Sequence, residues 1–191
     1  MVKHLPNAVT VARMLAIPLL VALALARRHE AFSLILVASL LGDILDGLLA
    51  RWLDAATPLG ALLDSIADTL LLYTAALGAW IFYPELLRTH LLAFLLVPGL
   101  WLAENAAALL RYGRLSSFHT LLSRVAAYAL GIFIGVLFLF GFQPWLLYPA
   151  LAVFVLATLE EFALLALLPQ WRADVRGLAW VLRDRAARSA R

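Results

Sequence analysis

The stretch GDILDGLLARWLDAATPLGALLDSIAD, residues 42–68, contains five aspartates, of which Asp54 lies in a short connector and the other four lie within two largely apolar segments. Asp43 and Asp46 lie in the first segment, and Asp64 and Asp68 lie in the second. If both segments cross a membrane, four unpaired aspartates would cost roughly 10 kcal/mol, at roughly 2.5–3.5 kcal/mol each. The apolar segments contain no comparable set of Lys or Arg, so we expect bound cations, and not ion pairs, to offset this cost.

The composition of the whole chain favours a membrane environment for these segments. Of the 191 residues, 65% are hydrophobic, whereas soluble domains have roughly 45–50% apolar residues. A soluble domain of this size exposes much of its surface to water and could not bury so many apolar side chains. The chain has no cysteine, which excludes disulfides and thiolate metal sites.

Six apolar runs are each long enough for the roughly 20 residues that a helix needs to cross a bilayer. They cover residues 8–26, 31–53, 58–82, 89–110, 120–141 and 146–168. The runs are too long and too continuous for barrel strands, which alternate over about 10 residues. We therefore expect an all-α fold, a six-transmembrane-helix bundle that forms one catalytic domain over residues 1–168. The first run is expected to be a span and not a cleaved leader.

The distribution of positive charge predicts the orientation of this bundle. Six spans place both termini on one side of the membrane, and of the 15 Lys and Arg residues all except Arg27, Arg28 and Arg88 fall on that side. Because cytoplasmic loops carry the excess of Lys and Arg, both termini and the acidic stretch are expected to face the cytoplasm. We expect an integral protein of a prokaryotic inner (cytoplasmic) membrane.

Helical spacing aligns the polar residues of each acidic segment along one face. Positions i, i+3, i+4, i+7 and i+8 of the first segment are Asp43, Asp46, Gly47, Ala50 and Arg51. In the second segment the aligned residues are Gly60, Asp64 and Asp68. Thr57 followed by Pro58 predicts a helix start, because a capping hydroxyl precedes a preset φ. The two helices should therefore be antiparallel neighbours with facing acidic stripes.

Carboxylate oxygens without thiolates are the donors that hard divalent cations prefer. Four carboxylates are enough for two such ions, and two ions can clamp a phosphate and neutralise its charge. An alternative is that the acids are protonated or hydrogen-bonded polar contacts between helices. A second alternative is a divalent-cation carrier, because carboxylates at membrane depth also mark ion paths.

The tail after Pro169 has a different pattern from the spans. Its apolar residues Trp171, Val175, Leu178 and Leu182 recur at helical spacing with arginines between them. This pattern predicts a helix that lies on the membrane surface, next to anionic lipid. The alternative is that residues 169–191 form a solvated basic cytoplasmic tail that only fixes the topology.

The acidic stretch also resembles a known family motif. The spacing Asp43-x2-Asp46-Gly47-x2-Ala50-Arg51-x8-Gly60-x3-Asp64-x3-Asp68 is similar to the full motif of the CDP-alcohol phosphotransferase family. The segment PNAVTVARMLAIP, residues 6–18, resembles the first helix of that family. The resemblance covers the first three helices closely and the later ones mainly by hydropathy.

The resemblance implies a membrane enzyme, often a homodimer, that transfers a phospho-alcohol group from a CDP-linked donor such as CDP-diacylglycerol to an acceptor hydroxyl and releases CMP. It implies that Asp43, Asp46, Asp64 and Asp68 hold two divalent cations, Mg²⁺ or Mn²⁺, and that Asp68 is also the catalytic base. It further implies that the CDP site includes Asn7, Thr10, Asp43, Gly47, Ala50, Arg51 and Gly60. Membrane lipids are the expected surroundings, and no nucleic acid is expected as a partner.

The segment RYGRLSSFHTLLSR, residues 111–124, is the candidate acceptor-binding region. Related enzymes with phosphorylated acceptors place basic residues there, and Arg binds phosphate bidentately. The candidates here are Arg111, Arg114, His119 and Arg124. They favour glycerol 3-phosphate, as in phosphatidylglycerophosphate synthases, with inositol phosphate or another alcohol as the alternative. Glu104, Asn105, Glu160 and Glu161 also lie in predicted spans, without an assigned role.

Overall fold

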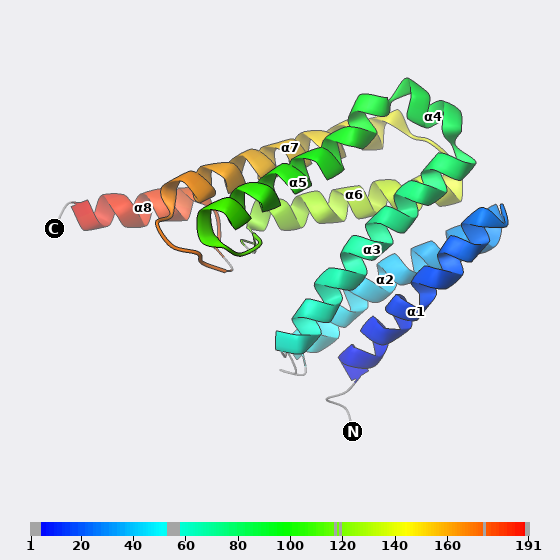
Figure 1. Ribbon diagram of the computed structural model, residues 1–191, viewed down its shortest axis with the longest axis horizontal. Coiled ribbons are helices and arrows are strands. Elements are labelled where there is room, and N and C mark those ends of the chain that lie inside the picture. Colours follow the sequence, from blue (N-terminus) through cyan, green and yellow to red (C-terminus); the bar gives the residue numbers. More distant parts are fainter. Residues whose placement is uncertain (1–4, 53–57, 117, 119, 174, 190–191) are drawn as a thin grey trace. The chain divides into compact units, whose positions relative to one another are not determined.

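The computed structural model describes residues 5–52, 58–116, 118, 120–173 and 175–189, with only the backbone described for residues 5–10, 44–52, 58–62, 64–65 and 188–189. All regular secondary structure in these ranges is helical (Figure 1). The helices are α1 (Leu5–Leu25), α2 (His29–Trp52), α3 (Pro58–Phe82), α4 (Pro84–Thr89), α5 (Leu91–Tyr112), α6 (Leu121–Phe140), α7 (Pro144–Leu167) and α8 (Leu178–Ser189). The all-α prediction is confirmed for the described residues.

The six long helices coincide with the six predicted apolar runs to within a few residues. Helices α5, α6 and α7 are each long and apolar enough to cross a membrane, which indicates an integral membrane protein. Helices α1 and α3 contain shorter apolar stretches, Val11–Leu25 and Ile66–Phe82, among the residues searched. The count of six spans stays a prediction.

The chain divides into two compact units. Unit 1 comprises residues 1–89 and 134–142, and unit 2 comprises residues 90–133 and 143–191. In unit 1, α1 packs against both α2 and α3, and α2 also contacts α3. Helix α3 begins at Pro58 as predicted, whereas Thr57, its predicted cap, lies outside the described residues.

An aromatic cluster in unit 1 joins α2, α3 and α6. Phe32 from α2 is fully buried against Phe138 from α6, with ring centroids 5.1 Å apart. Gly78 of α3 makes this contact possible, because a Cβ there would lie 2.4 Å from the Phe32 ring. At the edge of the cluster the Tyr83 hydroxyl donates to the Leu137 carbonyl at 3.0 Å. A hydroxyl has one proton to donate, so His29 Nε2, 2.8 Å from the same oxygen, must act as the donor to it.

Unit 2 is built on the packing of α5 against α7 (Figure 1). Its core is a buried apolar cluster of Ala108, Phe118, Leu164, Leu165, Leu168 and Val175. The last turn of a helix leaves carbonyls without partners, and side chains at the end of α5 supply donors for those of α7. Tyr112 Oη lies 2.8 Å from the Leu168 carbonyl, and an Arg111 guanidinium nitrogen reaches the Ala166 carbonyl at 3.3 Å. These contacts fasten the end of α5 to the end of α7.

The prediction of a continuous helix through Trp171 and Val175 is wrong. The helix of the tail begins only at Leu178, because the preceding residues pair with the α5–α6 connection instead. Val175 N–H donates to the Phe118 carbonyl at 2.8 Å, and the Trp171 indole N–H donates to the Leu115 carbonyl at 3.0 Å. Val175 therefore belongs to the core of unit 2, and the predicted basic helix is the shorter helix α8.

Candidate active site

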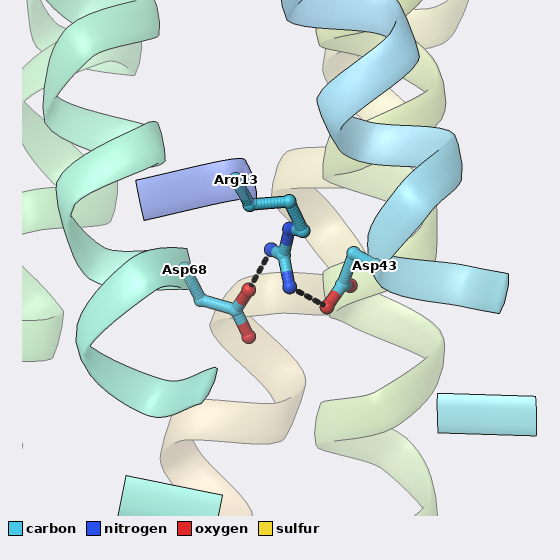
Figure 2. A network of polar contacts seen from close by, with 3 residues as sticks. All are labelled: Arg13, Asp43 and Asp68. Carbon is cyan, nitrogen blue, oxygen red and sulfur yellow. Dashed lines mark hydrogen bonds and ion pairs between the residues drawn. The ribbon is translucent and has the colours of Figure 1, made fainter. Parts of the chain in front are cut away.

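The candidate active site lies in unit 1, where α1, α2 and α3 pack together. One Arg13 guanidinium nitrogen, from α1, forms an ion pair with Asp43 Oδ1 of α2 at 2.8 Å. The other terminal nitrogen donates to Asp68 Oδ1 of α3. Figure 2 shows the guanidinium between the two carboxylates, so that one side chain joins three helices.

Burial is distributed unevenly within this triad. The Arg13 side chain is 4% exposed, whereas the side chains of Asp43 and Asp68 are 36% and 48% exposed. A buried charge is costly unless it is paired and hydrogen-bonded, and Arg13 meets this condition by contacting two carboxylates. The carboxylates retain a surface from which a ligand can approach them.

This pairing corrects the expectation that ion pairs do not offset the cost of the buried acids. For Asp43 and Asp68 a buried cation from the first helix does so. The sequence contained a signal for it, because an arginine within an apolar span is a functional suspect by default. The signal was incomplete, since Arg13 lies 30 residues from Asp43 in the chain and the pairing depends on how α1 packs.

For several predicted site residues the structure describes the backbone but not the side chain. The backbone places Asp46, Gly47, Ala50 and Arg51 on α2, Gly60 and Asp64 on α3, and Asn7 and Thr10 on α1. Asp64 falls about one helical turn before Asp68. That the two complete acidic stripes face each other therefore stays a prediction. The structure shows only that Asp43 and Asp68 both contact Arg13.

The triad supplies two carboxylates as possible metal donors, because the Arg13 guanidinium has no acceptor atom. Asp43 and Asp68 offer carboxylate oxygens from two helices, both partly exposed and both within reach of one guanidinium, and such oxygens are the donors that Mg²⁺ and Mn²⁺ prefer. Among the residues searched there is no group of three or more acidic, histidine or cysteine side chains that could hold a metal. Asp46 and Asp64, the other two predicted ligands, lie outside the side chains described.

The predicted acceptor residues belong to unit 2, where the structure describes side-chain contacts of Arg111 and Arg114. Arg111 donates to carbonyls at the end of α7, and the Arg114 guanidinium lies over the Trp171 ring, 5.3 Å from its centroid. Arg124 is exposed in the first turn of α6, and His119 lies outside the described residues. The acceptor role of all four stays a prediction.

The fold and the site define an all-helical integral membrane protein with a paired-aspartate site on its first three helices. A sequence model of the CDP-alcohol phosphatidyltransferase family matches residues 3–157. The chain belongs to this family, which confirms the resemblance found in the aspartate motif.

Two curated relatives match a shorter part of the chain. A CDP-diacylglycerol–glycerol-3-phosphate 3-phosphatidyltransferase of Pseudomonas fluorescens is 39% identical over 75 residues, which cover 38% of this chain and 38% of that protein. A protein with the same description from Rickettsia typhi is 39% identical over 74 residues, which cover 36% of this chain and 40% of that protein. The aligned segment thus spans well under half the length of either relative.

Proposed function

We propose that this chain transfers a phosphatidyl group from a CDP-linked lipid, such as CDP-diacylglycerol, to the hydroxyl of an acceptor alcohol and releases CMP. The observation that carries the proposal is the convergence of Asp43 and Asp68 on Arg13, within a chain whose residues 3–157 match the family. The complete aspartate motif at positions 43, 46, 64 and 68 supports the same conclusion.

In the proposed reaction the acceptor oxygen forms a bond to the phosphatidyl phosphorus while the bond from that phosphorus to the CMP oxygen breaks. CMP leaves with the electron pair of that bond, and the acceptor proton passes to the Asp68 carboxylate, which acts as the general base. Arg51 and the residues of the predicted CDP site bind the cytidylyl part. Two divalent cations, when held by the four aspartates, would neutralise charge on the phosphates.

We propose glycerol 3-phosphate as the acceptor. The two curated relatives carry this acceptor in their descriptions, and the basic segment that contains Arg111, Arg114, His119 and Arg124 offers the charge that an acceptor phosphate requires. An inositol phosphate would be bound by the same chemistry, and the acceptor screen described below distinguishes the two.

The proposal includes the surroundings in which the enzyme works. Residues 1–168 would act as one six-span catalytic domain, with residues 169–191 as a basic tail. The cytoplasmic side of a prokaryotic inner membrane would hold both termini and the active site, and the protein would function as a homodimer. The excess of Lys and Arg on one side of the six predicted spans supports this orientation.

The alternative of a divalent-cation carrier is disfavoured by the triad itself. A path for cations gains nothing from a buried guanidinium that contacts two of its carboxylates, because like charges repel. A carrier would move metal into liposomes and would be indifferent to CDP-linked lipids.

The proposed function is tested by giving the purified protein CDP-diacylglycerol, Mg²⁺ or Mn²⁺, and a panel of acceptors, and by measuring CMP release. Release with glycerol 3-phosphate supports the proposal, and release with an inositol phosphate instead corrects the acceptor. If no acceptor on the panel yields CMP, the proposed transferase activity is wrong. Asp64→Asn should abolish turnover in a protein that remains folded, and retained activity would remove Asp64 from the metal site.

A further inference from the structure

The Arg13 guanidinium uses both terminal nitrogens on carboxylate oxygens of the acidic site. One contact is the 2.8 Å pair with Asp43 Oδ1, and the other is the hydrogen bond to Asp68 Oδ1. Figure 2 shows the two carboxylates reached from opposite ends of the same planar group. Both aspartates are also predicted metal ligands, so a cation of the protein and a cation from solution would share these oxygens.

The guanidinium of arginine keeps its positive charge and has a rigid planar shape. The guanidinium does not lose its proton in proteins, and its planar fork holds two acceptors in a defined geometry. With 4% of its side chain exposed, Arg13 is shielded from water and ions that would screen its charge. The acidic site therefore contains a constant positive charge that does not depend on pH.

We propose that Arg13 is the internal counter-ion of the acidic site, and that it competes with divalent cations for Asp43 and Asp68 and weakens metal binding there. This inference rests on the metal site of the proposed function. Its consequence is that the enzyme binds its metals reversibly and at modest affinity, while the carboxylates stay paired at every level of metal occupancy. Arg13 is thus a positioning residue, because it acts through the aspartates.

The expected size of the effect follows from the usual influence of a neighbouring charge on a carboxylate. An adjacent unit charge changes the proton affinity of a carboxylate by about 1–3 pKa units, which corresponds to about 10- to 1000-fold. Removal of the Arg13 charge should therefore tighten divalent-cation binding by about tenfold or more, on the same basis.

The experiment measures Mn²⁺ binding to the purified full-length protein in detergent after treatment with EDTA, with free Mn²⁺ followed by electron paramagnetic resonance. Arg13→Gln and Arg13→Met remove the charge, and Met also preserves much of the side-chain volume, so that one neutral variant is available if the other does not fold. Arg13→Lys retains the charge. Arg88→Gln is the matched control, because Arg88 forms an exposed ion pair with Glu85 at 2.8 Å on α4.

Both neutral variants should bind Mn²⁺ about tenfold or more tightly than the unmodified protein, and Arg13→Lys and Arg88→Gln should stay close to it. The neutral variants should also unfold at a lower temperature in EDTA and gain more thermal stability from Mn²⁺, because only metal then neutralises the aspartates. Equal or weaker Mn²⁺ binding by the neutral variants would overturn this inference and leave the proposed function intact. Equal tightening by Arg13→Lys would also overturn it, and a lack of saturable Mn²⁺ binding in every variant would overturn the metal site as well.

Discussion

Both units of the molecule contain acidic side chains within apolar helices, but these side chains differ in their partners and in their exposure. In unit 1, Asp43 and Asp68 share a charged guanidinium and remain 36% and 48% exposed. In unit 2, Glu104 is 6% exposed, and the Glu161 carboxyl group lies within hydrogen-bond reach of it. Partner and exposure together therefore distinguish acids that a ligand can approach from acids that only join helices.

Glu160 gives the clearest example of an acid that joins helices. Its Oε1 accepts a hydrogen bond from the Leu178 N–H at 2.8 Å, which satisfies a donor in the first turn of α8. The approach is close, because a Cβ on Gly177, whose φ is +152°, would lie 2.9 Å from the same oxygen. A negative charge at the start of a helix also interacts favourably with the helix dipole. Glu160 therefore connects α7 to α8, a role that its sequence position alone did not reveal.

Among the variants that test the contrast between the two units, the largest expected effect is the loss of activity in Asp68→Asn. An amide cannot accept the acceptor proton, so CMP release should fall by about 10²- to 10⁴-fold, the usual contribution of a general base. Asp184→Asn on exposed α8 is the matched control and should retain full activity. Near-normal turnover in Asp68→Asn would mean that this carboxylate has only a structural role as the partner of Arg13. Asp68 would then resemble the acids of unit 2, which have structural contacts with other groups.

A smaller effect is expected when Glu104 is removed. Glu104→Ala removes the contact between Glu104 and Glu161 and should lower the free energy of unfolding by about 1–3 kcal/mol, a range that covers hydrogen bonds to neutral and to charged groups. Glu104→Gln should recover most of that stability, because its amide can donate to Glu161. Thermal unfolding measures both variants. A Glu104→Ala protein with unchanged stability but without CMP release would contradict the contrast between the two units. It would indicate that acids of unit 2 take part in the reaction.

Glu160→Ala should act locally, at the junction of α7 and α8. The loss of the contact to the Leu178 N–H should destabilise the start of α8 by about 1 kcal/mol, the typical value of a helix cap. Hydrogen exchange of the α8 amides should then be faster, with little change in α1–α3. Glu160→Gln keeps an acceptor oxygen, so the exchange rate of its α8 amides should lie between those of the unmodified protein and Glu160→Ala. Unchanged exchange in Glu160→Ala would show that α8 is held by its packing alone.

The smallest effect is expected for Arg88→Gln. The Arg88–Glu85 pair lies one turn apart on α4, and both side chains are largely exposed, so its loss should change the free energy of unfolding by less than about 1 kcal/mol. A larger change, measured by thermal unfolding, would mean that exposure is a poor guide to the worth of an ion pair in this protein. That result would weaken the contrast on which the roles of Arg13 and Glu104 depend.

Most of the helical framework followed from the sequence, because long apolar runs and their breakers are local properties. The run over residues 58–82 corresponds to α3, residue for residue. The short helix α4 was missed within the connector YPELLRT, although Pro84 and Glu85 are favourable residues for a first turn. The tail was predicted as a longer helix, since helical spacing does not reveal that Val175 pairs with the backbone of Phe118.

For the candidate site, the sequence alone determined which acids to suspect, because four aspartates in apolar segments require an explanation and their spacing aligns them on two helix faces. It also supplied the motif that the family match confirms. The tertiary structure was needed to show that Arg13 pairs with Asp43 and Asp68. It was also needed to show that the Leu178 N–H donates to Glu160. The physical reason is that charges and hydrogen bonds act over a few ångströms in space, between residues that helix packing brings together from distant parts of the chain.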